Sequence, residues 1–400
     1  MKYKVLRIMH RINVGGPTFH AGYLTKDLND DHFKTKLLVG NLDKDEKDGR
    51  YILQNLNVKP IYIKHMFRKI NLFNDIRAFI EIKKIIKDYA PDIVHTHAAK
   101  AGSIGRLAAI TSEVPLIIHT FHGHVFHSYF NQLITYMYIL IERFLAVKTN
   151  KIIAISKLQK SELSEKFKIA SKNKFEVIPL GFDLKKFNID KKNKRQIFRN
   201  QYNIKSEEIA VGIVGRLAPV KNHKLFIESI PLIISNTNKK IRFFIIGDGD
   251  ERDKLENLCK KLNIKFDNHL SEKFESVLCF TSWREDVDVV NSGLDLMALT
   301  SLNEGTPVSL IEAQASNLPI VTTDVGGVRD IIIENETALV CDKNSKENFS
   351  FLLLKLIENT YLREQLSNKG YNHVIKNFSR EKLVINIRNL YLELLNKKYI

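Results

Sequence analysis

The feature that most constrains the fold of this chain is a regular alternation between short apolar runs and amphipathic stretches. In the first half, the apolar runs are VLRIMH, TKLLV, KPIYI, DIVHTH, LIIHTF, KIIAIS and FEVIPL. The stretch IEIKKIIKDY, between two of these runs, has apolar residues at helical spacing and ends before Pro91. Strand-like and helix-like segments in this order predict an α/β fold, in which helices cover a parallel, doubly wound sheet.

The second half repeats the pattern and indicates a second domain of the same class. Its strand candidates are IAVGIVG, IRFFIIG, VLCFTS, LDLMALT, LPIVTTD and ETALVCD. The segment PLGFDLKKFNIDKK, residues 179–192, indicates a hinge. We therefore expect a first domain over residues 1–183, a second over residues 193–377, and a last amphipathic helix over residues 379–400. A chain of 400 residues is long enough for two such domains, each with its own core.

The charge of the chain is positive and uneven. Residues 1–190 contain 31 Lys and Arg against 18 Asp and Glu, a net +13, and residues 191–400 contain 31 against 27, a net +4. A basic first half favours contact with an anionic surface, such as lipid headgroups or a lipid-linked diphosphate. The competing interpretation is a compositional excess of lysine on solvated faces. No nucleic-acid partner is expected, because the basic residues are not interleaved with aromatic residues in a recognisable module.

Three further observations concern the cellular location. The first residues, KYKVLRIMH, indicate a strand and not a signal peptide. The cysteines are scattered without metal-type spacing and indicate reduced thiols: Cys259, Cys279 and Cys341. The aromatic-rich segment 125–148 has no apolar run long enough to span a membrane, and we expect a partly buried helix with an interfacial role. These patterns predict a cytoplasmic protein that contacts the inner face of the cell membrane peripherally through its basic first domain.

Glu304 and Glu312 bracket EGTPVSLIE, the stretch that says most about function. Thr306 as N-cap and Pro307 at the first helical position predict a helix that continues to Ala315. The two carboxylates would then lie roughly 8–12 Å apart along the helix axis. Between them would lie a helix N-terminus, which attracts anions. A nucleotide sugar, with a central phosphate and hydroxyl-rich groups on both sides, fits this pattern.

Seven motifs together resemble glycosyltransferase family 4, whose members are retaining enzymes of the GT-B fold. In chain order they are GGPTFH, DIVHTHAAKAG, HTFHGHVFH, VGRLAPVKN, IIGDGDER, SLNEGTPVSLIEA and TTDVGGVRD. The resemblance covers nearly the whole chain and is greatest to bacterial members that build surface polysaccharides. It implies two Rossmann-like domains facing a cleft, a first domain for the acceptor, a second for the donor, and a C-terminal helix that crosses back to the first domain.

The resemblance also implies roles for residues of the second half. Arg216 and Lys221 would neutralise the diphosphate of the donor, so that no divalent metal is needed. Glu312 would accept hydrogen bonds from the two ribose hydroxyls, and Glu304 would contact hydroxyls of the donor sugar. A short loop would present its backbone to the phosphates or the sugar: Gly305, Thr306, Pro307, Val308 and Ser309. Surface ion pairs and solvated faces are the competing roles for these charged residues.

His122, in TFHG, matches the family's histidine near the donor sugar and the acceptor. It would hydrogen-bond a sugar hydroxyl or organise the acceptor. The other histidines divide into expected core or loop residues (His95, His97, His119) and two without a favoured role (His124, His127). Neither a zinc site nor metal catalysis is expected, because the spacing is unsuitable and no cysteine accompanies the histidines.

Two glycine-containing loops complete the expected site. Gly15 and Gly16 would form a turn after the first strand, where the missing side chains let the backbone approach a phosphate. GGPTFHAG lacks the three-glycine dinucleotide fingerprint, so neither NAD nor FAD is expected and no cofactor is implied. Asp248 and Gly249 would lie near the nucleotide base or ribose, with a simple turn as the competing interpretation.

Together these inferences predict a hexosyltransferase or N-acetylhexosaminyltransferase. It would move a sugar, with retention, from a nucleotide-diphosphate-sugar donor to a lipid-linked or glycan acceptor of capsule, exopolysaccharide or O-antigen biosynthesis. A UDP-sugar is the favoured donor and a GDP-sugar the second choice. The alternatives are another GT-B activity, such as a sugar-nucleotide epimerase or a soluble-acceptor synthase, and a non-catalytic scaffold protein that binds nucleotide sugars.

Overall fold

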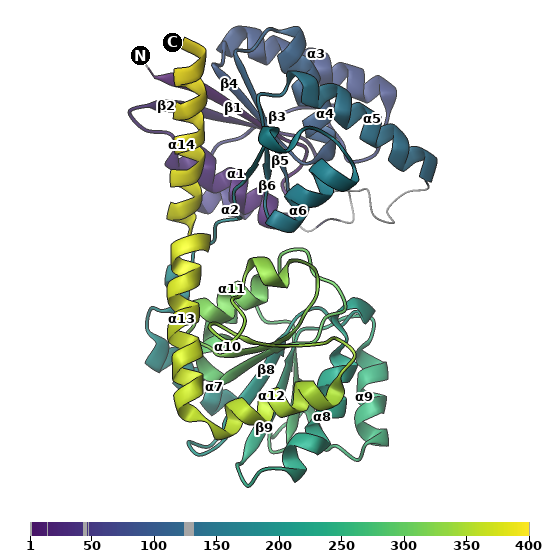
Figure 1. Cartoon of the computed structure of the whole chain (residues 1–400), viewed down its shortest axis with the longest axis vertical. Helices are drawn as coiled ribbons and strands as arrows, with labels where there is room; N and C mark the ends of the chain where they lie inside the picture. The colour runs from purple at the N-terminus through teal and green to yellow at the C-terminus, as the bar shows by residue number, and fades with distance from the viewer. Residues whose placement is uncertain (1, 14, 43–45, 47, 124–131, 400) are drawn as a thin grey trace. The chain divides into compact units, whose positions relative to one another are not determined.

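A computed structural model describes residues 2–13, 15–42, 46, 48–123 and 132–399 of the chain. Contacts divide the chain into two compact units, which we call the first domain (residues 1–182 and 378–400) and the second domain (residues 183–377). Each domain has a seven-stranded sheet flanked by helices (Figure 1). The expected α/β fold of two Rossmann-like parallel sheets is confirmed.

The sheet of the first domain is parallel throughout, in the order β3-β2-β1-β4-β5-β6-β7. β1 pairs with β2 on one side and with β4 on the other, so the direction of winding reverses between β1 and β4. Such a reversal opens a crevice at the carboxyl ends of the two strands. The strands are β1 Tyr3–Met9, β2 Phe33–Val39, β3 Ile61–Tyr62, β4 Ile93–His97, β5 Leu116–Phe121, β6 Lys151–Ala154 and β7 Phe175–Val177.

Helices cover both faces of this sheet. α3, α4 and α5 pack side by side on one face, and α1 packs with the C-terminal helix α14 on the other (Figure 1). The α-helices are α1 Gly16–Asp27, α2 Arg50–Asn55, α3 Leu72–Tyr89, α4 Ala99–Thr111, α5 Gln132–Lys148, α6 Lys157–Ser161 and α14 Arg380–Tyr399. The shorter helical turns are η1 Glu162–Lys166 and η2 Lys172–Lys174.

The helix α14 is part of the core of the first domain. Its apolar residues, among them Ile387 and Tyr391, pack in one cluster with Val5 of β1 and Leu24 of α1. The Tyr391 hydroxyl lies 2.6 Å from Nδ1 of His95. The expected return of the last helix to the first domain is therefore confirmed, and its burial explains why the sequence of this helix is amphipathic.

The second domain has the order β10-β11-β9-β8-β12-β13-β14, again parallel. Here the winding reverses between β8 and β12, the two neighbours that are far apart in sequence. The short edge strand β10 was not anticipated from the sequence. The strands are β8 Ile209–Val214, β9 Ile241–Ile246, β10 Phe266–Asn268, β11 Leu278–Ser282, β12 Leu296–Leu299, β13 Ile320–Thr323 and β14 Leu339–Cys341.

One apolar cluster, which includes Phe226, Phe243 and Phe280, fills the second domain on one face of its sheet. The α-helices are α7 Lys191–Gln201, α8 His223–Ser235, α9 Arg252–Lys261, α10 Val287–Gly293, α11 Val308–Ala315, α12 Lys346–Glu358 and α13 Thr360–Phe378. The 3-10 turns are η3 Lys185–Phe187, η4 Pro219–Lys221 and η5 Gly326–Asp330.

Candidate functional site

The expected donor residues follow neighbouring strands of the second domain. Asp248 follows β9, Arg216 and Lys221 follow β8, and Glu304 follows β12. These strands lie side by side in the sheet, so their loops share one edge. Lys221 and Glu304 stand on either side of the reversal between β8 and β12, where open α/β sheets bind their ligands.

Lys221 and Glu304 form an ion pair at this crevice. The Lys221 Nζ donates to Glu304 Oε1 at 2.6 Å, and the Ser301 hydroxyl donates to the same oxygen at 2.6 Å. The turn that carries the lysine is itself held, because the Thr300 hydroxyl donates to the Lys221 carbonyl at 3.0 Å. Among the described residues, no donor meets Glu304 Oε2, so this oxygen is oriented and open to a ligand hydroxyl.

Two glycines, Gly326 and Gly327, pack closely against the backbone of the Glu304 loop. Gly326 has φ +49°, and a Cβ on it would meet the Glu304 carbonyl oxygen at 2.0 Å. A Cβ on Gly327 would meet the Gly305 carbonyl oxygen at 1.7 Å, and its N–H donates to the Glu304 carbonyl at 2.9 Å. Only glycine permits this approach, which explains the paired glycines of TTDVGGVRD. A Cβ on Gly305 would meet nothing within 4 Å, so there is open space next to Gly305 in this loop.

The helix after this loop begins later than expected. α11 starts at Val308, and Pro307, with φ −72° and ψ 91°, is the N-cap in an extended conformation. The prediction that Thr306 is the N-cap and Pro307 the first helical residue is therefore wrong by one position. Among the described residues, no backbone acceptor receives the N–H groups of Gly305, Thr306, Val308 or Ser309. The helix start can therefore offer donors to an anion.

Glu312 lies in α11, among the buried residues Leu310, Ile311 and Ala313. Burial raises the pKa of its carboxyl to about 7, and the positive charge of Lys186 opposes this only in part. No hydrogen-bond donor among the described residues meets the carboxylate. A desolvated acid without a partner costs stability, and such groups concentrate at functional sites.

Arg216 and Asp248 have polar partners at the ends of neighbouring strands of the second domain. Arg216 pairs with Asp250 at 3.0 Å in an exposed position. The Asp248 carboxylate accepts from the Ser282 hydroxyl at 2.7 Å and from the Gly249 N–H at 2.8 Å. Burial opposes ionisation of Asp248, but these hydrogen bonds and the charge of Arg252 lower its pKa. Gly249 has φ +156°, and its missing Cβ lets the Leu217 carbonyl approach, so both residues have a loop-forming role.

A cluster of neutral histidines lies at the carboxyl ends of β4 and β5 in the first domain. His97 ends β4, His122 follows β5, and His20 lies on α1; the ring of His20 is 5.5 Å from that of His97 and 4.8 Å from that of His122. His97 Nδ1 and His122 Nε2 are 3.1 Å apart. Burial lowers the pKa of His122 to about 4, and it lowers the pKa of His20 and of His97 as well.

Several nitrogens of this histidine cluster face no partner in the described part of the chain. Both ring nitrogens of His20, Nε2 of His97 and Nδ1 of His122 are buried without a hydrogen bond. One ligand nitrogen from each of the three rings lies within 4.8 Å of the others, so the cluster could hold a metal ion or the hydroxyls of a sugar. His95, in contrast, is satisfied by Tyr391 and Thr120, as expected for a core residue.

Gly15 and Gly16, which the sequence also assigned to the site, precede His20 of this cluster in the chain. Gly15 is the N-cap of α1, and Gly16 opens the helix, so Gly16 is not part of a separate turn. An added Cβ at either glycine would meet only ordinary contacts, the nearest at 3.8 Å and 3.7 Å, which leaves room for a ligand. His124 and His127 lie outside the described residues.

Sequence reasoning did not single out three residues of these crevices. Ser301 orients Glu304, and its place at the head of SLNEGTPV was the available signal. His20 ends GGPTFH, but only the fold brings it to His97 and His122. Ala98, after β4, has φ 62° and ψ 169°, a conformation normally adopted by glycine, and such strain concentrates at functional sites.

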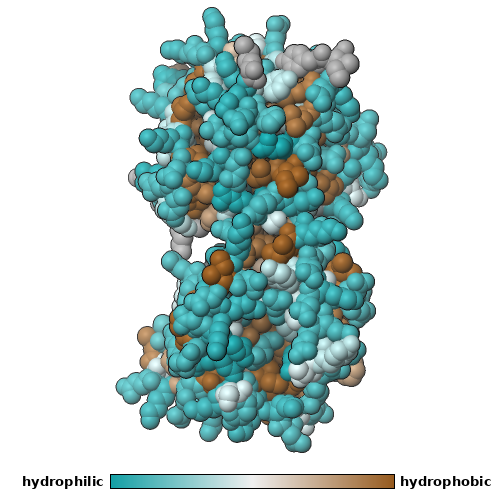
Figure 2. Space-filling view, turned by 90° about the vertical axis from the view of Figure 1, so that its left-hand side faces the viewer, coloured by the Kyte–Doolittle hydropathy of each residue, from teal (hydrophilic) through white to brown (hydrophobic). Residues whose placement is uncertain are grey.

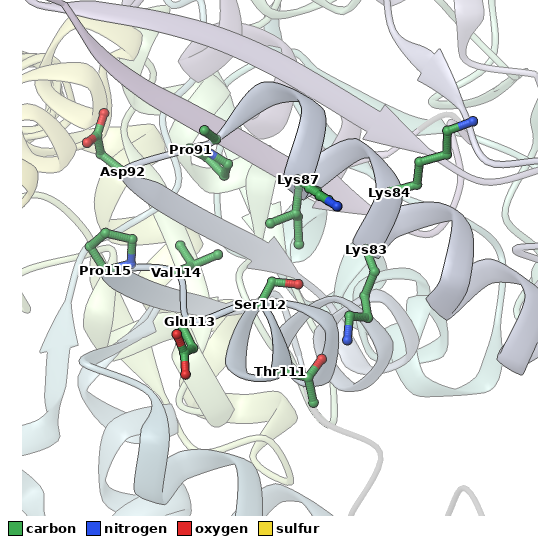
Figure 3. Close-up of a pocket in the computed structure, with 12 residues that line it drawn as sticks. Lys83, Lys84, Lys87, Pro91, Asp92, Thr111, Ser112, Glu113, Val114 and Pro115 are labelled. Carbon is green, nitrogen blue, oxygen red and sulfur yellow. The ribbon is translucent and has the colours of Figure 1, made fainter.

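A hollow of about 690 Å³ opens in the first domain at the amino ends of the sheet strands. It is lined by the ends of α3 and α4 and by the residues just before β4 and β5. Figure 3 shows Lys83 reaching from α3 toward Thr111 at the end of α4, whereas Lys84 points away from that helix end. Because this hollow lies at the amino ends of the strands, it is separate from the crevice between β1 and β4.

Comparisons with known proteins cover both halves of the chain. Residues 14–186 match the model of Glycosyltransferase Family 4, and residues 194–373 match Glycosyl transferases group 1. The chain is 30% identical over 344 residues to the UDP-Gal:alpha-D-GlcNAc-diphosphoundecaprenol alpha-1,3-galactosyltransferase of Escherichia coli, covering 86% of each protein. It is 24% identical over 355 residues to the capsular polysaccharide biosynthesis glycosyltransferase CapM of Staphylococcus aureus, covering 86% of this chain and 87% of CapM.

A solved structure agrees with the fold. Anabaena HepE, crystallised in complex with UDP, superposes with a TM-score of 0.78 at 17% identity, over 98% of this chain and 100% of HepE. At this identity the likeness supports the fold alone. None of the helices in the described part of the chain is both long and apolar enough to cross a membrane.

Proposed function

Since the chain belongs to glycosyltransferase family 4, we propose that it transfers a sugar from a nucleotide-diphosphate-sugar donor to a lipid-linked or glycan acceptor. The pathway would be the biosynthesis of a bacterial surface polysaccharide. That the chain is a glycosyltransferase follows from its family. The donor, the acceptor and the stereochemistry are the proposal.

The Lys221–Glu304 pair carries the proposal. It lies where the winding of the second sheet reverses, beside the free N–H groups that begin α11. A lysine and a helix N-terminus together favour a diphosphate, and a neighbouring carboxylate favours hydroxyl groups. A nucleotide sugar needs these two kinds of contact next to each other.

Charge development in the reaction gives each residue a role. As the bond between the anomeric carbon and the diphosphate breaks, negative charge grows on the leaving phosphate. Lys221, Arg216 and the start of α11 would stabilise that charge, and Arg216 would leave the exposed Asp250 to do so. Glu304 Oε2 would hold a hydroxyl of the donor sugar.

Glu312 would bind the ribose. Its carboxylate is desolvated and has no donor in the described part of the chain, and two ribose hydroxyls would supply the missing hydrogen bonds. Binding would then favour the ionised carboxylate and lower its pKa. The cost of this buried group in the free protein is consistent with a ligand-binding role.

His122 would receive a sugar hydroxyl in the first domain. Burial holds its pKa near 4, so the ring is neutral at pH 7 and can accept or donate one hydrogen bond at each nitrogen. We propose transfer with retention, in which the leaving phosphate accepts the proton of the incoming hydroxyl on the same face. No residue is then needed as a general base.

The names of the relatives guide the choice of substrates. The Escherichia coli relative is named for UDP-Gal and a GlcNAc-diphosphoundecaprenol acceptor, and HepE was crystallised with UDP. We therefore propose a UDP-hexose donor, with UDP-galactose as the first to test, and an acceptor sugar on a lipid diphosphate. Such an acceptor would bring the enzyme to the inner face of the cell membrane.

The proposal is tested with the purified chain and a panel of donors: UDP-galactose, UDP-glucose, UDP-N-acetylglucosamine and GDP-mannose. The acceptor is N-acetylglucosamine diphosphate on a short lipid. We expect transfer from a UDP-hexose in the presence of EDTA, an α-linked product from an α-linked donor by NMR, and loss of transfer in Glu304→Ala.

Three results would contradict parts of the proposal. Full activity in Glu304→Ala would remove the assigned site. Loss of transfer in EDTA with rescue by manganese would contradict the metal-free mechanism. Conversion of the donor without any acceptor would instead indicate an epimerase, and donor binding without turnover on any acceptor would indicate a binding protein.

A further inference from the structure

The helix α5 of the first domain exposes most of its apolar side chains. Only Glu142, Leu145 and Ala146 of its 17 residues are buried. The exposed set contains Leu133 at 70%, Phe144 at 68% and Val147 at 70% of their full accessibility. The exposed large apolar residues of α5 are Leu133, Ile134, Tyr136, Met137, Leu140, Ile141, Phe144 and Val147.

These side chains form one continuous face. Leu133, Met137, Leu140, Phe144 and Val147 follow each other at spacings of four and three residues, which places them on one side of a helix. At 100° per residue, the exposed apolar set covers a sector of roughly 160°. Among the charged residues of the described helix, Arg143 lies just beside this sector and Lys148 lies within it at the helix end, so no acid borders it. This face is the reverse of an ordinary surface helix, whose polar side faces water.

Polar contacts hold the helix in this orientation. The only acid of α5, Glu142, points inward and pairs with Arg106 of α4 at 2.6 Å. Lys174 donates to the Ala146, Val147 and Thr149 carbonyls at 2.7, 2.9 and 3.0 Å and so caps the end of the helix. A rotation that buried the apolar face would break the Glu142–Arg106 pair, which makes the exposed face a stable feature of the fold.

The neighbouring helices extend the apolar surface on the same side of the sheet. The first half of α3 exposes four large apolar residues: Leu72, Phe73, Ile76 and Ile80. On α4, which packs between α3 and α5, Leu107 is 39% exposed. The face that carries α14 differs, because hydrophilic residues dominate it and hydrophobic ones form only small groups (Figure 2).

Basic residues border this apolar surface. Arg77 lies on the exposed side of α3 with its guanidinium 4.0 Å from the Phe73 ring, and Lys84 and Lys87 follow on the same helix. Lys148 ends α5. The whole first domain holds 34 Lys and Arg against 18 Asp and Glu, a net +16, whereas the second holds 28 against 27, a net +1. Nearly all the net charge of the chain therefore belongs to the domain with the apolar face.

We propose that the outer face of α5, together with the start of α3, is a docking surface for a bilayer that contains anionic lipids. Leu140 and Phe144 would enter the boundary between headgroups and acyl chains, while Lys84, Lys87 and Lys148 would contact lipid phosphates. α5 would lie in the membrane plane, since no described helix can span. The biological need for this contact rests on the proposed lipid-linked acceptor, but the surface itself is independent of the transfer reaction.

A second copy of the chain is the competing occupant of an apolar helix face. The charge favours the bilayer, because two first domains of net +16 would repel each other, whereas an anionic surface attracts them. A large exposed apolar patch is typical both of membrane-binding surfaces and of protein–protein interfaces. The test must therefore distinguish a bilayer from a second copy of the chain.

The test measures binding of the full chain to vesicles of phosphatidylcholine alone and of phosphatidylcholine with phosphatidylglycerol. We expect binding to the anionic vesicles, and at least tenfold weaker binding by the double variant Leu140→Glu with Phe144→Glu. The matched control is Ile385→Glu with Phe351→Glu, which adds the same charge at residues that are 50% and 62% exposed on α14 and α12. The control should bind within twofold of the wild type.

Additional measurements make each outcome decisive. The α5 variant should keep its thermal transition, its UDP affinity and its transfer to a water-soluble acceptor, so that a folding failure is recognised. A second variant, Ile76→Glu with Ile80→Glu, tests the α3 part of the surface. Equal vesicle binding by the α5 variant and the wild type would overturn the proposal. A wild-type dimer that becomes monomeric in the α5 variant would overturn it in favour of a second copy. Loss of transfer with intact vesicle binding would contradict only the proposed function.

Discussion

The two domains share one topology and differ in how they use charge. The first domain has a net charge of +16, and a cluster of buried, neutral histidines lies at the carboxyl ends of its strands β4 and β5. In the second domain the net charge is only +1, yet its crevice contains the Lys221–Glu304 ion pair. The same sheet architecture therefore carries a cluster of neutral histidines at its strand ends in one domain and an ion pair in the other.

Surface charge and charge at the ends of buried strands act in different ways. Surface charge attracts a partner over a distance and is weakened by salt. Charge inside a crevice stabilises a reacting group at close range and is screened much less. The surplus charge belongs to the first domain and the Lys221–Glu304 pair to the second, so substitutions in the two domains should have effects of different type and size.

The largest expected effect concerns the interior of the first domain. Glu142→Ala leaves Arg106 buried without its partner, and breaking such a pair costs about 3–5 kcal/mol. Chemical denaturation should show a loss of this size in the transition of the first domain only. The control replaces both partners, Arg106→Met with Glu142→Leu, and should be far less destabilising. A loss below about 1 kcal/mol in Glu142→Ala would contradict the importance of this pair.

The next effect concerns the charge of the second crevice. Lys221→Ala should lower kcat by about 10²–10³-fold, the usual result of removing one donor that stabilises a developing anion. The control is Lys224→Ala on α8, which removes an exposed lysine that lies 3.7 Å from Glu228. Steady-state kinetics with the best donor compares the two. If both variants retained activity within threefold of the wild type, the phosphate role of Lys221 would be wrong.

Glu312→Gln should change the pH dependence of stability. The folded protein holds the Glu312 proton up to about pH 7, above its ordinary pKa, so it binds more protons than the unfolded chain. Stability therefore falls as pH rises through this range, and the cost is complete above pH 7. The variant should be more stable than the wild type by about 1–3 kcal/mol at pH 8, and equal to it at pH 4.

The same variant should bind UDP more weakly if Glu312 holds the ribose. Thermal melts at pH 4, 6 and 8, with and without UDP, measure both effects. Glu347→Gln is the control, because the Glu347 side chain is 78% exposed. A constant difference in stability across the pH range would show that the carboxyl is not desolvated.

The smallest effect concerns the exposed pair of the second domain. The Arg216 and Asp250 side chains are 60% and 80% exposed, so Asp250→Ala should change stability by less than about 1 kcal/mol. Freed from Asp250, Arg216 should bind UDP at least as well as in the wild type, measured by calorimetry. Weaker UDP binding would contradict the idea that Arg216 exchanges Asp250 for phosphate.

The fold could be predicted because buried parallel strands leave a clear mark in the sequence. Runs such as LIIHTF and IRFFIIG coincide with β5 and β9, since both faces of these strands are covered and must be apolar. The edge strand β10 was missed because its sequence, Phe266–Asn268, is short and polar. The helix α14 was predicted from its own pattern, but its place on the first domain came only from the family resemblance.

The site could be predicted as a set of loops, but not as a set of contacts. Strand ends place Lys221 and Glu304 at one edge, but the shared hydrogen bond with Ser301 depends on tertiary packing. α5 shows the limit most clearly, because both of its sides are apolar. Periodicity alone cannot tell which side is buried, and the inward position of Glu142 depends on Arg106 of another helix.

The return of α14 to the first domain has a consequence for biosynthesis on the ribosome. The second domain is a continuous segment, residues 183–377, and can fold as soon as it has emerged. The first domain begins to emerge earlier, but Leu24 and Val5 meet Ile387 and Tyr391 only after the whole second domain has been translated. The order of completion is thus the reverse of the order of synthesis, and the nascent first domain would depend on chaperones to shield its open core during the interval.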